Sequence, residues 1–245
     1  MQDGVTRRTE PWMICDALRM AFLTTHIGFR QQKACELVGS TSVAVVCTRT
    51  HLYIGETAGR GASRTHPRCG VRSPWRSEAL CSPLAANCGD SRAVLKRGAR
   101  VLPLTCDQKP ARQDEADRVV AAGGKIYMTD GYRINGVLAM TRAIGDVALE
   151  RAGVVPDPEL TVLERSDEDE VIVVASDGLW EVMSNDMAVD TACKAIARVQ
   201  QKGHTRNVGC KHAAKVIANH ALKVGSSDNI SVVVLDLKKS NWQWQ

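Results

Sequence analysis

Apolar residues recur at intervals of three and four positions in four stretches of the chain, and this periodicity predicts helices. The four stretches are residues 11–37, Ala111–Ala122, Asp186–Gln201 and Cys210–Val224. Gly123-Gly124 and Gly225 follow two of them, and glycine is a frequent residue just beyond the end of a helix.

Short runs of β-branched and aliphatic residues lie between these stretches and predict strands. We expect three hairpins, formed by Ser42–Cys47 with His51–Ile54, by Ala86–Cys88 with Arg92–Leu95 across Gly89-Asp90, and by Tyr132–Ile134 with Val137–Leu138 across Asn135-Gly136. Further strands are expected at Lys125–Met128, Glu170–Ala175 and Ile230–Leu237. Because the helices are grouped and do not alternate with single strands, the pattern favours an α+β fold of antiparallel sheets covered by helices.

Residues 55–85 break this pattern, because neither the strand period nor the helix period continues through them. Arginines recur every fourth position from Arg60 to Arg76, but Pro67 and Pro74 fall among them and exclude a continuous helix. Glycine, proline and serine recur through the remaining positions. We therefore expect a disordered insert here.

Composition adds limits on function. The 245 residues are 44% hydrophobic and 24% charged, as in ordinary globular proteins. No apolar run approaches the roughly 20 residues that span a bilayer, and no secretory signal opens the chain. The nine cysteines form no C-x-x-C pair, which favours free thiols in a reducing compartment over zinc binding. We expect a monomer in the cytoplasm, the nucleus or both, with no membrane or nucleic-acid partner, since much of the net charge of +5 lies in the insert.

Four aspartates at strand ends and turns are the candidate metal ligands: Asp90, Asp146, Asp177 and Asp228. Carboxylate oxygens are the ligands that Mg²⁺ and Mn²⁺ prefer. Each aspartate beside a glycine is also typical of an ordinary turn. Asp177 is the strongest candidate, because the strand before it is too apolar to lie at the surface and a buried, unpaired carboxylate costs several kcal/mol.

Seven segments together resemble the metal-dependent protein phosphatase family, the type-2C serine/threonine phosphatases, and most closely its plant members. These segments are Glu36–Thr41, Ala86–Leu95, Asp107–Pro110, Ala122–Gly124, Arg133–Asp146, Val174–Met183 and Gly225–Val234. They occur in the family's order over residues 12–54 and 86–237. The resemblance implies one phosphatase-like domain over residues 12–237, with flexible tails at 1–11 and 238–245.

The family's fold implies two antiparallel β-sheets packed face to face, with helices on both outer faces. Its chemistry implies hydrolysis of phosphoserine and phosphothreonine in proteins, with two Mn²⁺ or Mg²⁺ ions that activate a water. By position, Asp177 and Asp228 match ligands of one of these ions, and Asp90 matches an aspartate of a third, weaker site. Asp146, Gly178, Asn229 and Ser176 are expected to support the site. Phosphorylated proteins are the implied substrates, and a regulatory protein is a further expected partner.

Two departures from the family pattern bear on activity. Nothing in residues 1–38 matches the family's Asp-Gly-His-Gly segment, its earlier acidic ligand or its phosphate-binding arginine. We therefore expect an incomplete sandwich without its N-terminal strands, one half of the metal site, and weak or absent turnover. The alternative is a phosphatase-like binding module without catalysis.

The second departure is the insert. Deleting residues 55–85 joins His51–Ile54 to Ala86–Asp90 and restores the family's strand. A Gly-Glu pair such as Gly55-Glu56 can be encoded by a sequence that resembles a splice donor. Our hypothesis is that the segment is a retained intron translated in frame.

Overall fold

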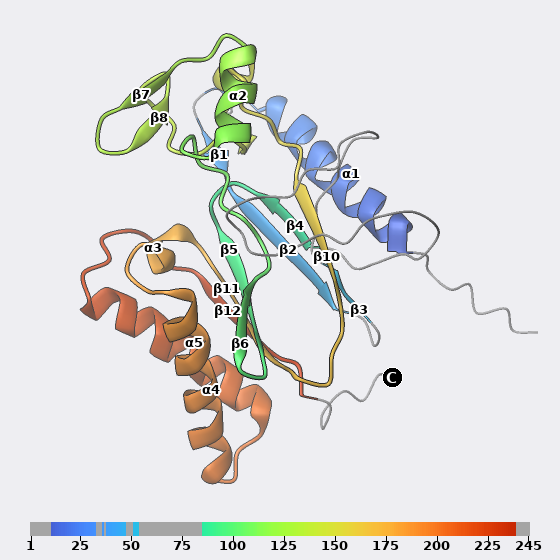
Figure 1. Cartoon of the computed structure of the whole chain (residues 1–245), viewed down its shortest axis with the longest axis vertical. Coiled ribbons are helices and arrows are strands. Elements are labelled where there is room, and N and C mark those ends of the chain that lie inside the picture. The colour runs from blue at the N-terminus through green and yellow to red at the C-terminus, as the bar shows by residue number, and fades with distance from the viewer. Residues whose placement is uncertain (1–10, 33–35, 37, 48–50, 54–84, 239–245) are drawn as a thin grey trace, which may run out of the picture.

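The computed structural model describes residues 11–32, 36, 38–47, 51–53 and 85–238. Its elements form four layers, with a helix, two sheets and a helical pair stacked in that order (Figure 1). This arrangement confirms the predicted fold of two antiparallel sheets with helices on both outer faces.

The first sheet contains β2 (Ser42–Cys47), β3 (His51–Tyr53), β4 (Ala85–Cys88) and β10 (Glu159–Glu164). Its pairings form a cycle because β2 and β10 each pair with both β3 and β4. On β2, Val46 pairs with Tyr53, and the residue before it, Val45, pairs with Ala85. On β10, Val162 and Thr161 pair with the same two residues. Thus β3 and β4 lie end to end as one central strand.

The second sheet has the order β12-β11-β5-β6, with every pair antiparallel. Its strands are β5 (Arg92–Arg97), β6 (Arg100–Pro103), β11 (Asp169–Ala175) and β12 (Val232–Asp236). The valines and isoleucine of β11 explain its central place, because side chains on both faces of this strand are buried.

Apolar clusters fix the layers. Phe22 and Leu18 of α1 (Pro11–Arg30) pack against the outer face of the first sheet. Leu95 and Ile172 lie in the core between the two sheets. On the outer face of the second sheet, α4 (Asn185–Gln201) and α5 (Arg206–Lys223) bury a cluster that includes Ile217.

A smaller unit lies at one end of the two sheets (Figure 1). It consists of α2 (Gln113–Ala121), β7 (Ile126–Met128), β8 (Tyr132–Ile134) and the 3₁₀ helix η1 (Val147–Ala152), around a core that includes Val119 and Ile134. The two-residue strands β1 (Gly39–Ser40) and β9 (Ile144–Gly145) pair nearby. The short helix α3 (Asp177–Trp180) directly follows β11.

Some predicted elements are confirmed and others are wrong. The first helix ends at Arg30, well before residue 37, because no apolar repeat continues through Gln31 and Gln32, which form turns with Gly28 and Phe29. The predicted hairpin of Ala86–Cys88 with Arg92–Leu95 does not form, because β4 and β5 belong to different sheets. Strands β6 and β10 were not predicted. Helix α5 begins at Arg206, four residues before the predicted start.

The Asn135-Gly136 turn forms, with φ of 50° and 74°, but it closes only a single bridge between Ile134 and Leu138. The hairpin of this region is instead made by β7 and β8. Residue 85 belongs to β4, and the remainder of the predicted insert lies outside the described residues, as do most of the predicted tails. Among the helices described, none combines the length and apolarity needed to cross a membrane.

Candidate metal centre

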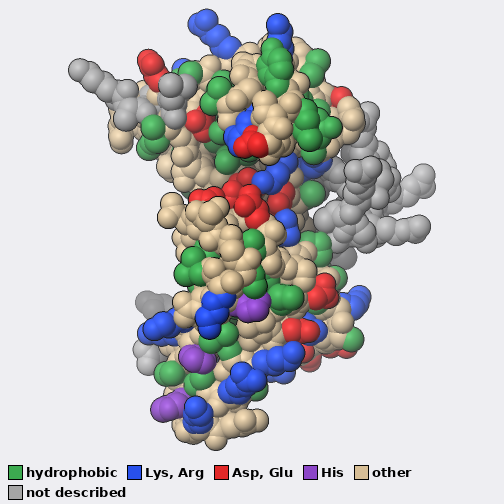
Figure 2. Space-filling view, turned by 90° about the vertical axis from the view of Figure 1, so that its left-hand side faces the viewer, with side chains coloured by type: hydrophobic (Ala, Val, Ile, Leu, Met, Phe, Trp, Pro, Cys, Tyr) green, Lys and Arg blue, Asp and Glu red, His purple; other side chains and the backbone are tan. Residues whose placement is uncertain are grey.

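Strand register brings three of the predicted aspartates to one edge of the second sheet. Ala175, at the end of β11, pairs with Arg92 at the start of β5 and with Val232 at the start of β12. Asp177 follows this end of β11, whereas Asp90 precedes β5 and Asp228 precedes β12. In Figure 2, acidic side chains gather between the unit formed by α2, β7 and β8 and the helices α3 to α5.

The loop that carries Asp228 lies directly against Gly178, which explains the Asp-Gly sequence at the start of α3. A Cβ added to Gly178 would lie 2.6 Å from the Asn229 carbonyl oxygen and 3.3 Å from Asp228 Cβ, so only glycine fits without displacement. The Ser176 hydroxyl donates to the Asn229 carbonyl at 3.1 Å and accepts from the Ser231 amide at 3.0 Å. Gly178, Asn229 and Ser176 therefore hold Asp177 and Asp228 on adjoining backbone segments.

Asp90 is buried, with 2% of its surface exposed. The Lys109 ammonium lies 2.9 Å from Asp90 Oδ2. The other oxygen, Asp90 Oδ1, is also buried and has no hydrogen-bond partner within the described part of the chain. A buried carboxylate oxygen without a partner is costly, and it marks a position suited to a ligand.

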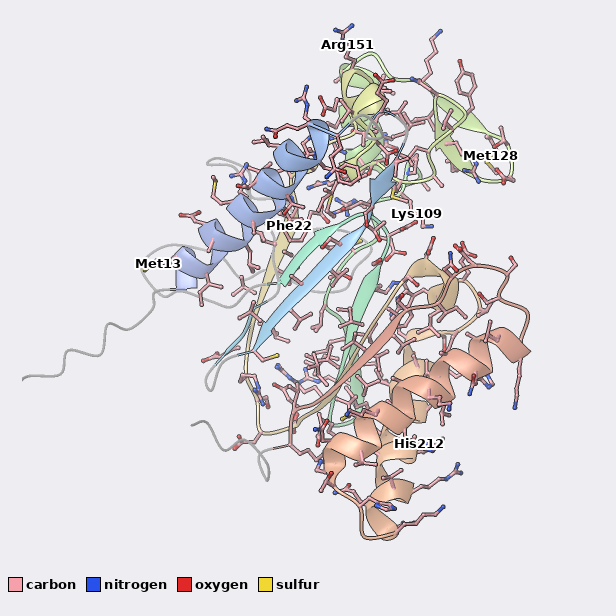
Figure 3. All side chains as sticks on the ribbon, turned by 180° about the vertical axis from the view of Figure 1, so that it is seen from behind. Met13, Phe22, Lys109, Met128, Arg151 and His212 are labelled. Atoms are coloured by element: carbon pink, nitrogen blue, oxygen red, sulfur yellow. The ribbon has the colours of Figure 1, made fainter. Side chains whose placement is uncertain are left out.

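Lys109 is a site residue that the sequence analysis missed, although the Asp107–Pro110 segment was noted. The fully buried side chain of Gln108 positions it. Gln108 Oε1 accepts from the Gly89 amide at 2.6 Å, and its Nε2 donates to the Asn87 carbonyl at 3.0 Å. These bonds join the loop of Lys109 to the turn of Asp90. Figure 3 shows Lys109 near the sheet edge from which α3 begins.

The electrostatics of Asp177 show that the three carboxylates act on one another. Burial raises the pKa of Asp177, and the charges of Asp90 and Asp228 raise it further. The Lys109 ammonium opposes this effect. Negative charge thus accumulates at this edge, and a cation stabilises such a cluster.

The residues present fit a hard divalent cation. The donor set is oxygen, and Asp90 contributes a buried oxygen without a protein partner. The oxygens of Asp90, Asp177 and Asp228 do not all lie within 4.8 Å of one another. Mg²⁺ keeps several of its waters, so one or two of these carboxylates together with water would be enough to hold it.

A tighter acidic group exists elsewhere. In the part of the chain that the structure describes, three carboxylates with oxygens within 4.8 Å of one another are those of Asp114, Glu115 and Glu159. Arg112 contacts all three. Arg118 and Arg142 donate to Glu115 at 2.7 Å and 2.6 Å. Three guanidinium groups already balance the three carboxylates, so this group is an ion-pair network of the fold and a poor cation site.

Asp146 is not among the charged groups that act on Asp177. It is buried, has a φ of 48° and precedes η1. With Gly39, Thr41 and Met140 among its neighbours, it lines a hollow of about 500 Å³. Burial raises the pKa of Asp146. Support of the site by Asp146 stays a prediction.

Comparison with known proteins identifies the family. The family model described as Protein phosphatase 2C matches residues 83–230 of this chain. The chain belongs to the protein phosphatase 2C family. This match confirms the resemblance predicted from sequence and includes Asp90, Lys109, Asp177 and Asp228. The protein phosphatase 2C family is metal-dependent.

Similar sequences and structures agree with this assignment. Protein phosphatase 2C 7 of Arabidopsis thaliana is 48% identical over 170 residues, which are 65% of this chain and 33% of that protein. Protein phosphatase 2C 77 of Arabidopsis thaliana is 41% identical over 217 residues, covering 83% of this chain and 44% of that protein. The chain thus spans less than half the length of these two relatives.

The fold comparison gives the same family architecture. Serine-threonine phosphatase 2C from Toxoplasma gondii superposes with a TM-score of 0.66 at 21% identity, covering 91% of this chain and 67% of that one. At this identity the likeness shows the fold alone. It agrees with the two-sheet sandwich that places Asp177 and Asp228 at one sheet edge.

Proposed function

We propose that this chain carries part of the centre of a metal-dependent protein serine/threonine phosphatase, in which Asp177, Asp228 and Asp90 hold Mn²⁺ or Mg²⁺. The observation that carries the proposal is the buried Asp90 Oδ1, which has no partner among the described residues, at the sheet edge where the charges of Asp90 and Asp228 act on Asp177. The proposed reaction is hydrolysis of phosphoserine and phosphothreonine in proteins. A bound divalent cation would supply positive charge for the phosphate oxygens and lower the pKa of a water.

Each residue has a distinct task in this proposal. Asp177 and Asp228 would bind the cation from the two backbone segments that meet at Gly178. Asp90 would approach from the turn between the two sheets. Ser176 and Asn229 keep the spacing of these segments through hydrogen bonds between the residue that follows β11 and the loop that precedes β12. Rigid placement of charged groups lets them act without reorganising during the reaction.

Charge balance sets the expected activity. Three carboxylates and the Lys109 ammonium give a formal charge of −2, which balances one divalent cation, whereas the family uses two. We therefore expect this chain to bind one cation and to hydrolyse phosphopeptides weakly. Phosphopeptide binding without turnover, as a phosphatase-like binding module, is the second candidate, and the same charge balance favours it. A regulatory protein partner and a cytoplasmic or nuclear location stay predictions.

The test combines Mn²⁺ calorimetry with hydrolysis of a phosphothreonine peptide. Wild-type protein is expected to bind about one Mn²⁺ and to hydrolyse the peptide slowly, and Asp177→Asn is expected to lose both properties. Asp117→Asn is the matched control, because Asp117 is exposed on α2 and accepts a hydrogen bond from Gln113. Absence of Mn²⁺ binding to wild-type protein would refute the proposal. Phosphopeptide binding with Mn²⁺ but no turnover would favour the binding module.

A further inference from the structure

Lys109 occupies the position that a cation would compete for at Asp90. Its ammonium lies 2.9 Å from Asp90 Oδ2 and its side chain is 37% exposed, whereas that of Asp90 is 2% exposed. An ion pair with one deeply buried partner is screened less by solvent than a pair at the surface. Lys109 therefore neutralises part of the carboxylate cluster from within the protein.

The charges around Lys109 explain why its ammonium pairs with Asp90 and not with Asp107. Asp107 lies two residues away, but Arg92 binds it with two hydrogen bonds, from Nε at 2.9 Å and Nη2 at 2.7 Å. Arg92 Nη1 also donates to Asn185 Oδ1 at 2.8 Å, so Asp107 and Asn185 hold the Arg92 side chain, and the charge of Asp90 acts on it without a direct contact. Asp90, Asp107 and Asp177 are the carboxylates that raise the pKa of Lys109. Since Arg92 forms its hydrogen bonds with Asp107, the Lys109 ammonium is the cation in direct contact with Asp90, and it also acts at longer range on Asp177.

We propose that Lys109 is a positioning residue that sets the cation affinity of this centre. Its ammonium acts as a built-in monovalent cation at Asp90, and it must move away before a divalent cation can bind both Asp90 oxygens. This inference rests on the proposed function, because it assumes that the three aspartates are the cation ligands. Lys109 keeps the Asp90 carboxylate paired, and its positive charge weakens the binding of a divalent cation.

The direction of the effect follows from the charge. With Lys109 the cluster has a formal charge of −2, and without it −3. Removing one positive charge a few ångströms from a divalent ion, in a partly solvated site, corresponds to affinity about tenfold tighter or more. A lysine that merely supported the fold would have the opposite effect, because its loss would disorder the Asp90 turn and weaken binding.

The experiment measures Mn²⁺ affinity by calorimetry and thermal unfolding in EDTA for wild type and three variants. Lys109→Met removes the charge and keeps an unbranched apolar stem, whereas Lys109→Arg keeps the charge. Lys96→Met is the matched control, because Lys96 forms a similar pair with Asp190, at 3.1 Å, against α4. All variants are compared at the same pH and ionic strength.

We expect Lys109→Met to bind Mn²⁺ about tenfold more tightly than wild type and to unfold at a lower temperature in EDTA, because Asp90 loses its partner. Lys109→Arg should retain the wild-type affinity, and so should Lys96→Met. Equal or weaker Mn²⁺ binding by a folded Lys109→Met protein would overturn the proposal. If wild-type protein binds Mn²⁺ but hydrolyses no phosphopeptide, the phosphatase function fails while the affinity comparison still decides the role of Lys109.

Discussion

Tyr53 and Ala85 occupy consecutive positions of one strand, although residues 54–84 separate them in sequence. The partner strands on both sides agree on this register, because β2 and β10 each run past the junction without a shift. The register supports the hypothesis that a segment interrupts a strand of the phosphatase fold. The register joins Tyr53 to Ala85. The deletion of residues 55–85 that the sequence suggested would join the chain one residue later on each side.

Deleting residues 54–84 should therefore leave the fold intact and make it more stable. The deletion joins Tyr53 directly to Ala85 and removes the loop-closure entropy of the intervening chain, about 3 kcal/mol for a loop of this size. Urea unfolding followed by circular dichroism would measure the gain in the free energy of unfolding. A deletion variant that is less stable than wild type would show that the segment itself stabilises the domain. Sequencing the transcript tests the separate hypothesis of a retained intron.

The sequence predicted the carboxylates of the site better than it predicted their surroundings. Asp177 and Asp228 flank strands whose apolar character is local, so their places at the ends of β11 and β12 followed from pattern alone. Asp90 was placed in a hairpin turn, but its segment crosses between the sheets, since strand pairing depends on distant segments. Lys109 was missed because a lysine in a loop carries no periodic signal. Its importance comes from Gln108, whose contacts with Gly89 and Asn87 form only in the folded chain.

Replacing Asp177 by Asn should separate stability from function. Burial and the charges of Asp90 and Asp228 raise the pKa of Asp177, so its ionised form is disfavoured in the folded protein. In EDTA at neutral pH, Asp177→Asn should therefore unfold at the same or a higher temperature than wild type. Mn²⁺ at 100 times its Kd should stabilise wild type by about 2.7 kcal/mol and leave the variant unchanged. Thermal melts with and without Mn²⁺ make the comparison, and equal stabilisation of both proteins would exclude Asp177 as a ligand.

Glu115 should be a major contributor to stability, with no role in metal binding. Its carboxylate is 1% exposed and accepts hydrogen bonds from Arg118 and Arg142. Replacing it by Gln leaves the partly buried guanidinium of Arg118 without a counter-charge and that of Arg142 with Glu159 alone. Breaking an ion pair with a buried partner typically costs about 3–5 kcal/mol. Urea unfolding measures the loss. Asp130→Asn, which breaks the exposed pair with Arg133, is the control and should leave stability unchanged.

Glu115 should also affect how the free energy of unfolding depends on pH in acid. Arg118 and Arg142 lower the pKa of Glu115 from its ordinary value of 4.5, although burial alone would raise it. A carboxyl group with a lowered pKa in the folded state stabilises the fold fully above its unfolded value and loses this contribution as the pH falls. Wild-type protein should thus lose stability as the pH falls below about 4.5, and Glu115→Gln should show a shallower slope there. Parallel slopes in unfolding experiments from pH 6 to pH 3 would contradict this account.

Gly178→Ala should damage the centre through geometry alone. The new Cβ would meet the Asn229 carbonyl oxygen at 2.6 Å, so the Asp228–Asn229 loop must move away from Asp177. Overpacking of this kind typically costs about 1–3 kcal/mol, and the displacement should also weaken Mn²⁺ binding. Gly136→Ala is a control for the general cost of a glycine substitution, because a Cβ there meets no atom within 4 Å, although its φ of 74° adds backbone strain. If Gly178→Ala lowered stability no more than Gly136→Ala and bound Mn²⁺ as wild type does, the close approach of the two segments would not be what brings the aspartates together.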